Sequence, residues 1–134
     1  MMMKRILLIG LLACLPVRGE SPLADAVQNS NHALIRSLLA KEVDANAPQA
    51  DGMTGLHWAA QNEDPGSVKA LLKAGADAAV TNRYGITPLW IACRNGNEAI
   101  VKRLLAAGSD PNGRQIGGET VLMTAARTGN LKSV

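Results

Sequence analysis

The apolar positions of this chain recur at a fixed spacing of 33 residues. One leucine repeats four times at that spacing, as Leu23, Leu56, Leu89 and Leu122. Twelve residues after each of them comes a branched aliphatic residue: Ile35, Val68, Val101 and Val134. A strict period of this length predicts a stacked array, in which each unit buries its apolar face only against its neighbours.

The third unit predicts a pair of helices most clearly. Thr87 can cap a helix that starts at Pro88 and stops near Asn95–Gly96, where glycine can adopt a left-handed conformation. A second helix is predicted from about Glu98 to Ala107, with an apolar stripe on one face. The segment 109–118 is rich in Gly, Pro, Asn and Asp, which predicts a turn between helix pairs. The four units are expected at about 20–49, 50–82, 83–115 and 116–134, the last incomplete.

The segments "TGLHWAA" at 54–60 and "TPLWIACRNGN" at 87–97 resemble the opening motif of ankyrin repeats. The resemblance covers about residues 20–134. It implies an all-α, helix-turn-helix solenoid with short β-hairpin turns between the repeats. Only the second unit keeps the histidine of the motif, as His57, while Trp90 holds that place in the third unit. There the imidazole is expected to hydrogen-bond the threonine and nearby backbone.

Both ends of the array depart from this pattern. The first unit lacks a preceding hairpin and has Glu42 where a helix-ending glycine is expected, so we interpret it as an N-terminal cap. The fourth unit stops at Val134, inside its second helix. This predicts an N-terminal fragment of a longer array or an incomplete gene model. The alternative is a short, frayed C-terminal cap.

Residues 1–19 have the layout of a secretory signal peptide, with early positive charges, a short apolar run and small residues after it. Cleavage after Gly19 would release an exported chain, periplasmic or secreted. The alternative is a lipoprotein, because residues 11–14 resemble a bacterial lipobox that would be lipidated at Cys14. A further alternative is an uncleaved apolar start that has no sorting role.

The leader also accounts for the basic balance of the chain. The formal net charge is +3, and Lys4, Arg5 and Arg18 all lie in the leader. Without these three, 11 of the 14 basic residues remain against 11 acidic ones. We therefore expect no nucleic-acid partner, and no membrane partner unless Cys14 is lipidated.

No spacing in the sequence predicts a catalytic, cofactor or metal site, and we expect neither an enzyme nor a cofactor. There is no nucleophile elbow, phosphate loop or dinucleotide fingerprint. His32, His57 and Cys93 do not form a spaced set of metal ligands. Cys93 is interpreted as a small buried filler, with a reactive thiol as the alternative. Trp58 matches a core position between helices, and Trp90 is expected to be half-buried.

The resemblance implies that a partner protein would bind the concave face, formed by the hairpin tips and the first helices. Arg83, Tyr84 and Arg94 supply the side-chain types most common at binding hot spots. The alternative for Tyr84 is that the turn simply tolerates an exposed aromatic residue that has no binding role. The predicted protein-binding residues are Asp51, Met53, Gln61, Asn62, Arg83, Tyr84, Ile86, Arg94, Asn95 and Arg127.

These predictions lead to a non-catalytic protein-interaction scaffold that acts outside the cytoplasm. One alternative is an accessory binding arm of a larger exported enzyme or toxin, whose catalytic part would lie beyond Val134. Another is a structural spacer without a partner.

Overall fold

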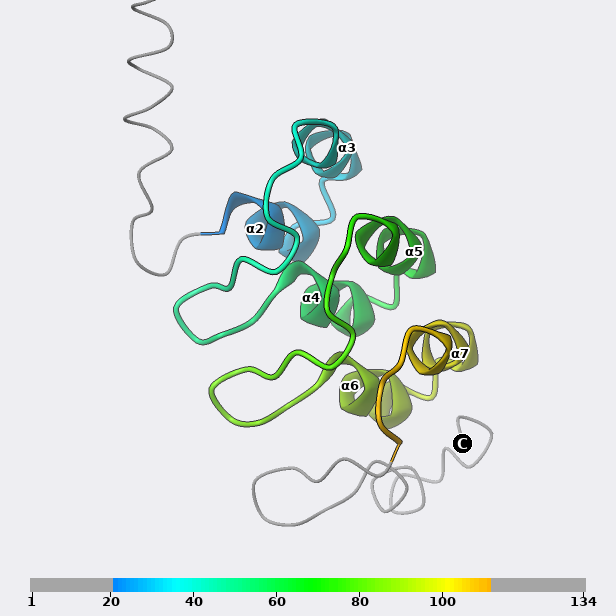
Figure 1. Ribbon diagram of the computed structural model, residues 1–134. Coiled ribbons are helices and arrows are strands. Elements are labelled where there is room, and N and C mark those ends of the chain that lie inside the picture. The colour runs from blue at the N-terminus through cyan, green and yellow to red at the C-terminus, as the bar shows by residue number, and fades with distance from the viewer. Residues whose placement is uncertain (1–20, 112–134) are drawn as a thin grey trace, which may run out of the picture.

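The structure is a computed structural model that describes residues 21–111, which form three consecutive helix pairs (Figure 1). The first helices of the pairs are α2 (Pro22–Gln28), α4 (Gly55–Gln61) and α6 (Pro88–Asn95). The second helices are α3 (His32–Ala40), α5 (Pro65–Lys73) and α7 (Glu98–Ala106). The first helices stack in one row and the second helices in a row beside it, while the long loops project from the other side of the first helices (Figure 1). The predicted all-α solenoid is confirmed.

Each of the described helices is preceded by a residue with a short polar side chain, and most of these side chains cap the helix directly. Thr87 Oγ1 accepts a hydrogen bond from the backbone N–H of Trp90 at 3.2 Å, as predicted for the start of α6. In the second helices, Asp64 Oδ1 accepts from the N–H of Ser67 at 3.2 Å, and Asn97 Oδ1 accepts from that of Ile100 at 3.1 Å. These bonds satisfy donors that the first turn of a helix leaves without an intrahelical partner. The sequence spacing therefore placed the helix starts correctly, and α7 ends one residue before the predicted Ala107.

The core lies between the two rows of helices and consists of the residues that recur along the chain. Leu56 and Leu89 are fully buried, as are the branched residues that follow them in α5 and α7. The recurring larger members of this core are Leu23, Ile35, Leu56, Val68, Leu71, Leu89, Val101 and Leu104. Because α4 packs against both α2 and α6, and α5 packs against α7, neighbouring units stabilise one another.

The turn inside each helix pair requires a left-handed residue at one position. Gly96 occupies it in the third pair with φ of 72°, whereas the equivalent residues are Ser30 with φ of 55° and Glu63 with φ of 53°. A residue with a Cβ atom is strained in this region, and glycine is not. The first two pairs therefore form the same turn at a higher conformational cost than the third.

Replacing Glu63 by glycine is expected to raise the free energy of unfolding by about 0.5–1 kcal/mol, because it removes the left-handed strain at an exposed side chain. The matched change, Gly96→Ala, should lower it by about 1 kcal/mol. Urea unfolding of both variants measures these effects. Equal effects of the same sign would show that the turn conformation does not control stability here.

The loops between repeats have the shape of hairpins, but no residue within 21–111 forms a β-strand. The backbone N–H of Gln49 donates to the Met53 carbonyl at 2.8 Å, and that of Asn82 donates to the Ile86 carbonyl at 3.1 Å. A second bond closes each turn, from Gly52 N–H to the Gln49 carbonyl and from Gly85 N–H to the Asn82 carbonyl, but no ladder long enough to count as a strand forms. The loops therefore follow the hairpin course that the family resemblance implies, but they contain no β-strands within residues 21–111.

Candidate functional site

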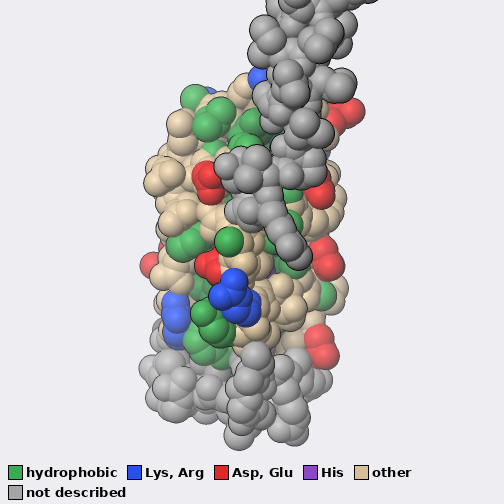
Figure 2. Space-filling model, turned by 90° about the vertical axis from the view of Figure 1, so that its left-hand side faces the viewer, with side chains coloured by type: hydrophobic (Ala, Val, Ile, Leu, Met, Phe, Trp, Pro, Cys, Tyr) green, Lys and Arg blue, Asp and Glu red, His purple; other side chains and the backbone are tan. Residues whose placement is uncertain are grey.

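The predicted binding residues that the structure describes lie on the loops and at the ends of α4 and α6, while Arg127 lies outside the described residues. We call this surface the loop face: the loops 49–53 and 82–86 together with the exposed sides of α4 and α6. Figure 2 looks at the molecule from the loop side. Basic side chains lie in the lower half of this view next to hydrophobic ones, and several acidic side chains lie along its right-hand edge.

Successive loops are joined to each other through their backbones. The N–H of Arg83 donates to the Asp51 carbonyl at 2.9 Å, which links the two loop tips. Gly52, with φ of 83°, makes this approach possible, because a Cβ atom there would lie 2.9 Å from the Arg83 nitrogen. The loop tips are therefore fixed relative to one another before any partner binds.

Three predicted binding residues help to shape these loops. Asp51 Oδ1 accepts from the N–H of Met53 at 3.0 Å, and the Met53 sulfur accepts from Asn82 Nδ2 at 3.4 Å. The half-buried side chains of Met53 and Ile86 pack against the core. These three side chains therefore form contacts within the array itself.

Two further predicted residues, Asn62 and Asn95, bond the preceding repeat. The amide of Asn62 donates to the carbonyl oxygens of Val27 at 2.9 Å and Gln28 at 3.3 Å, at the end of α2. Asn95 donates to the Ala60 carbonyl at 3.5 Å, at the equivalent place in α4. The Val27 and Ala60 carbonyls also accept backbone bonds from Ser30 and Glu63 at the same turns. Each amide therefore joins two repeats and is already engaged within the array.

Four of the predicted residues are exposed, namely Gln61, Asn62, Arg83 and Tyr84, and Arg94 is half-buried. Tyr84 is 57% exposed, and its hydroxyl makes no hydrogen bond to another described residue. Arg83 Nη2 donates to the Ala50 carbonyl at 3.0 Å, and Arg94 Nη2 donates to Gln61 Oε1 at 2.7 Å. Both guanidinium groups are therefore held in place by a neighbouring repeat.

A tryptophan supports one of these arginines. The guanidinium carbon of Arg94 lies 5.0 Å from the centroid of the Trp90 ring, a distance typical of a cation–π contact. Trp90 is half-buried, as expected, and its indole N–H is buried without a hydrogen-bond partner among the described residues. Arg94 is thus positioned both by stacking and by its bond to Gln61.

The sequence did not reveal one polar cluster on the loop face, which is centred on Gln49. Its Nε2 donates to Asp25 Oδ1 at 2.6 Å and to Gln28 Oε1 at 3.0 Å, while its Oε1 accepts from Trp58 Nε1 at 2.8 Å. Trp58 is accordingly half-buried: its ring packs against the core, as predicted, and its indole N–H reaches the loop residue Gln49. The repeat pattern does not indicate this cluster, because Asn82 occupies the position equivalent to Gln49 in the next repeat and forms different hydrogen bonds.

His57 connects the start of α4 to the following repeat. Its Nδ1 accepts from the backbone N–H of Thr54 at 3.1 Å, and its Nε2 donates to the Ile86 carbonyl at 2.8 Å. This pattern requires the neutral ring with its proton on Nε2. Burial lowers the pKa of His57 below its ordinary value of 6.5, although the bond to Ile86 and the charge of Asp51 act in the opposite direction. The structural role expected from the sequence is confirmed.

The free energy of unfolding should therefore fall on acidification in part because of His57. Its pKa is near 6.5 in the unfolded chain and lower in the folded one, so the unfolded state binds more protons as the pH drops below 6.5. The stabilisation is fully present above that pH and is lost as the pH falls through the folded pKa. Urea unfolding at pH 7.5 and pH 5 should show a smaller pH difference for His57→Asn than for the parent. An unchanged difference would contradict this account.

Cys93 lies buried in the described segment. Burial raises the pKa of the Cys93 thiol to about 11, so it stays protonated at neutral pH. In the segment 21–111 no group of three histidine, cysteine or acidic residues could hold a metal ion. None of its helices is long and apolar enough to traverse a bilayer.

The geometry defines a helical repeat scaffold. Hydrogen bonds between neighbouring repeats hold the side chains of its loop face in place. Residues 4–82 and residues 56–134 match the family model described as ankyrin repeats, three copies. The chain belongs to the ankyrin repeat family, whose members generally mediate protein–protein interaction and are typically non-catalytic. The first match begins inside the segment 1–19 predicted as a leader. The comparison with curated proteins finds no match.

Proposed function

We propose that this chain is a non-catalytic scaffold that binds another protein through its loop face. The observation that supports this most is the set of Arg83, Tyr84 and Arg94 on one repeat, with both guanidinium groups held by neighbouring residues. Tyrosine and arginine are the side chains most often found at hot spots of protein interfaces. They supply large contact areas and directional donors to a partner.

The rigidity of this face favours binding. Ordering a side chain at an interface costs about 0.5–1.5 kcal/mol, and a side chain that is already held loses less. Arg94 is fixed by Gln61 and Trp90, and the loop tips are joined by the bond between Arg83 and Asp51. A partner would therefore meet a surface that needs little rearrangement.

The test of this function is capture of a partner by the immobilised chain. The full chain is used, and the same chain with Arg83, Tyr84 and Arg94 all changed to alanine serves as the control. A protein retained by the parent and lost from the triple variant, while that variant remains folded, supports the loop face. Equal retention on both columns would overturn it.

We further propose that the protein acts after export, as a periplasmic or secreted protein. The charged start, short apolar run and small residues of segment 1–19 support this. Mass analysis of the N-terminus tests it, with loss of residues 1–19 expected for soluble export and a lipidated Cys14 for the lipoprotein route. A cytosolic protein that retains Met1 would contradict export.

A further inference from the structure

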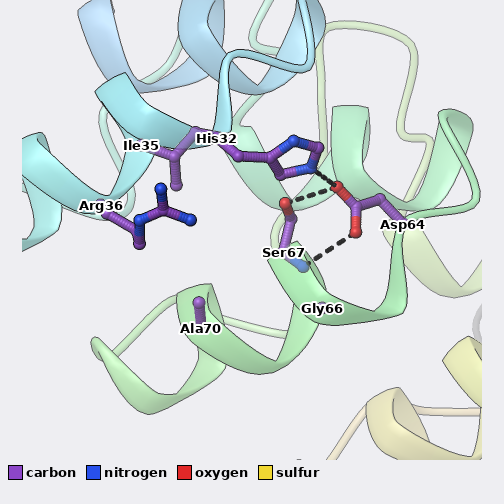
Figure 3. Close-up of a pocket in the computed structure, with 7 residues that line it drawn as sticks. All are labelled: His32, Ile35, Arg36, Asp64, Gly66, Ser67 and Ala70. Carbon is purple, nitrogen blue, oxygen red and sulfur yellow. Dashed lines mark hydrogen bonds and ion pairs between the residues drawn. The ribbon is translucent and has the colours of Figure 1, made fainter.

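A second concavity lies on the side of the molecule away from the loops, between the second helices α3 and α5 (Figure 3). Its volume is about 280 Å³. The walls combine apolar and charged side chains, principally those of His32, Ile35, Arg36, Asp64, Ser67 and Ala70. We call this concavity the outer groove.

The outer groove is open because α5 presents small residues there. Ser67 and Ala70 line it, whereas the equivalent residues of α7 are Ile100 and Arg103. The larger side chains of α7 can fill the corresponding step between α5 and α7, and those of α5 cannot fill the step next to α3. The smaller side chains at these two positions of α5 therefore leave room for the groove next to α3.

One end of the outer groove is polar but already satisfied. Asp64 Oδ2 accepts from His32 Nε2 and from the Ser67 hydroxyl, both at 2.7 Å, and Oδ1 accepts from the Ser67 N–H (Figure 3). Partial burial would raise the pKa of Asp64, but these hydrogen bonds from Ser67 and His32 outweigh it and lower the pKa. The carboxylate therefore stays ionised and is engaged inside the protein.

This end does not form a catalytic serine site. The hydroxyl of Ser67 donates to a carboxylate, and His32 bonds that same carboxylate instead of the serine oxygen. Activation of a serine requires a base that accepts the hydroxyl proton. Since Asp64 lies between them, the three residues fix the groove wall and do not build a nucleophile.

The other end of the outer groove carries the positive charge of Arg36. Arg36 forms no hydrogen bond or ion pair with any residue of the described segment, and Figure 3 shows its guanidinium group directed into the space between α3 and α5. Ile35 and Ala70 flank it with aliphatic carbon. An arginine fork beside an apolar wall is suited to bidentate recognition of a carboxylate.

We propose that the outer groove binds a small carboxylate that carries a short aliphatic group. The carboxylate would pair with Arg36, and the aliphatic part would lie on Ile35 and Ala70. The volume of about 280 Å³ lies just below the range of about 300–1,000 Å³ for drug-sized ligands, which favours a small free molecule over a peptide segment. This site is separate from the loop face and does not depend on the partner proposed for it.

The test is a titration of the full chain with 4-methylpentanoate at constant ionic strength, followed through backbone amide NMR signals. We expect saturable shifts at amides of α3 and α5, including those of His32, Ser67 and Ala70. The uncharged analogue 4-methylpentanamide should cause no saturable shift. Absence of saturable shifts with the carboxylate, or equal shifts with the amide, would overturn the proposal.

Three variants make this test specific. Arg36→Gln should weaken binding about tenfold, the loss expected when a charge-assisted hydrogen bond is removed. Lys102→Gln changes the equivalent exposed residue of α7 and should leave binding unchanged. Ala70→Leu should block the groove without adding charge, and its amide spectrum shows whether the fold persists. Equal affinities for Arg36→Gln and the parent would contradict the role of the arginine.

Discussion

Replacing Leu89 by alanine is expected to lower the free energy of unfolding by about 2–5 kcal/mol. Leu89 is 1% exposed and belongs to the leucine series that recurs every 33 residues. Truncation removes buried carbon atoms and leaves a cavity that close-packed helices on both sides cannot fill. The effect should be large because α6 contacts α4 and α7 through this part of the core.

Urea unfolding of Leu89→Ala against the parent measures this loss. Lys69→Ala is the matched control, since Lys69 is exposed on α5 and its replacement should change the free energy by less than about 0.5 kcal/mol. Similar losses for the two variants would mean that the buried and exposed faces of the repeats are assigned incorrectly.

Replacing Tyr84 by alanine is expected to weaken binding of the captured partner by about 2 kcal/mol or more, which corresponds to roughly 30-fold in affinity. Tyr84 is exposed at a loop tip whose backbone is joined to the preceding loop, so the ring is presented from a fixed position. Its truncation should leave the free energy of unfolding nearly unchanged, because little of the ring is buried.

Calorimetric titration of the parent and of Tyr84→Ala with the partner gives both affinities. Lys102→Ala, an exposed change on the second helix α7, should bind like the parent. If Tyr84→Ala retains full affinity while Lys102→Ala loses it, the partner binds the second helices and not the loop face.

The helix pairs and their core could be predicted from the sequence because they depend on local rules that the repeat presents several times. Thr87 and Pro88 mark a helix start by capping and by a fixed φ angle, and Gly96 marks the turn that follows. Leu89 marks the buried face by its recurrence. The helix starts and turns can be recognised within one repeat, and the buried face from a comparison of repeats, so the sequence pattern was sufficient for both.

The use of polar side chains could not be predicted in the same way, because it depends on contacts between repeats. Asn62 and Asn95 have exposed-face positions in the sequence pattern, yet each donates to carbonyl groups of the preceding helix. Gln49 and Trp58 meet only once the loop folds over α4. A 33-residue period gives the position of such residues but not the partner that each one selects.

The outer groove was likewise hidden from the sequence pattern. Ser67 and Ala70 look like ordinary helix residues until they are compared with Ile100 and Arg103 at the same positions of α7. Their effect arises only when α3 and α5 lie side by side and the missing volume becomes a cavity. The difference in side-chain volume between equivalent positions of successive repeats is therefore the sequence feature that indicates the groove.

Hydrogen–deuterium exchange of the chain with and without its captured partner tests the central claim most directly. If the loop face binds the partner, protection should increase in the loops 49–53 and 82–86 and at the ends of α4 and α6 that carry Gln61 and Arg94. The amides of α3, α5 and α7 should change little. Protection confined to α3, α5 and α7, with unchanged loops, would contradict the account.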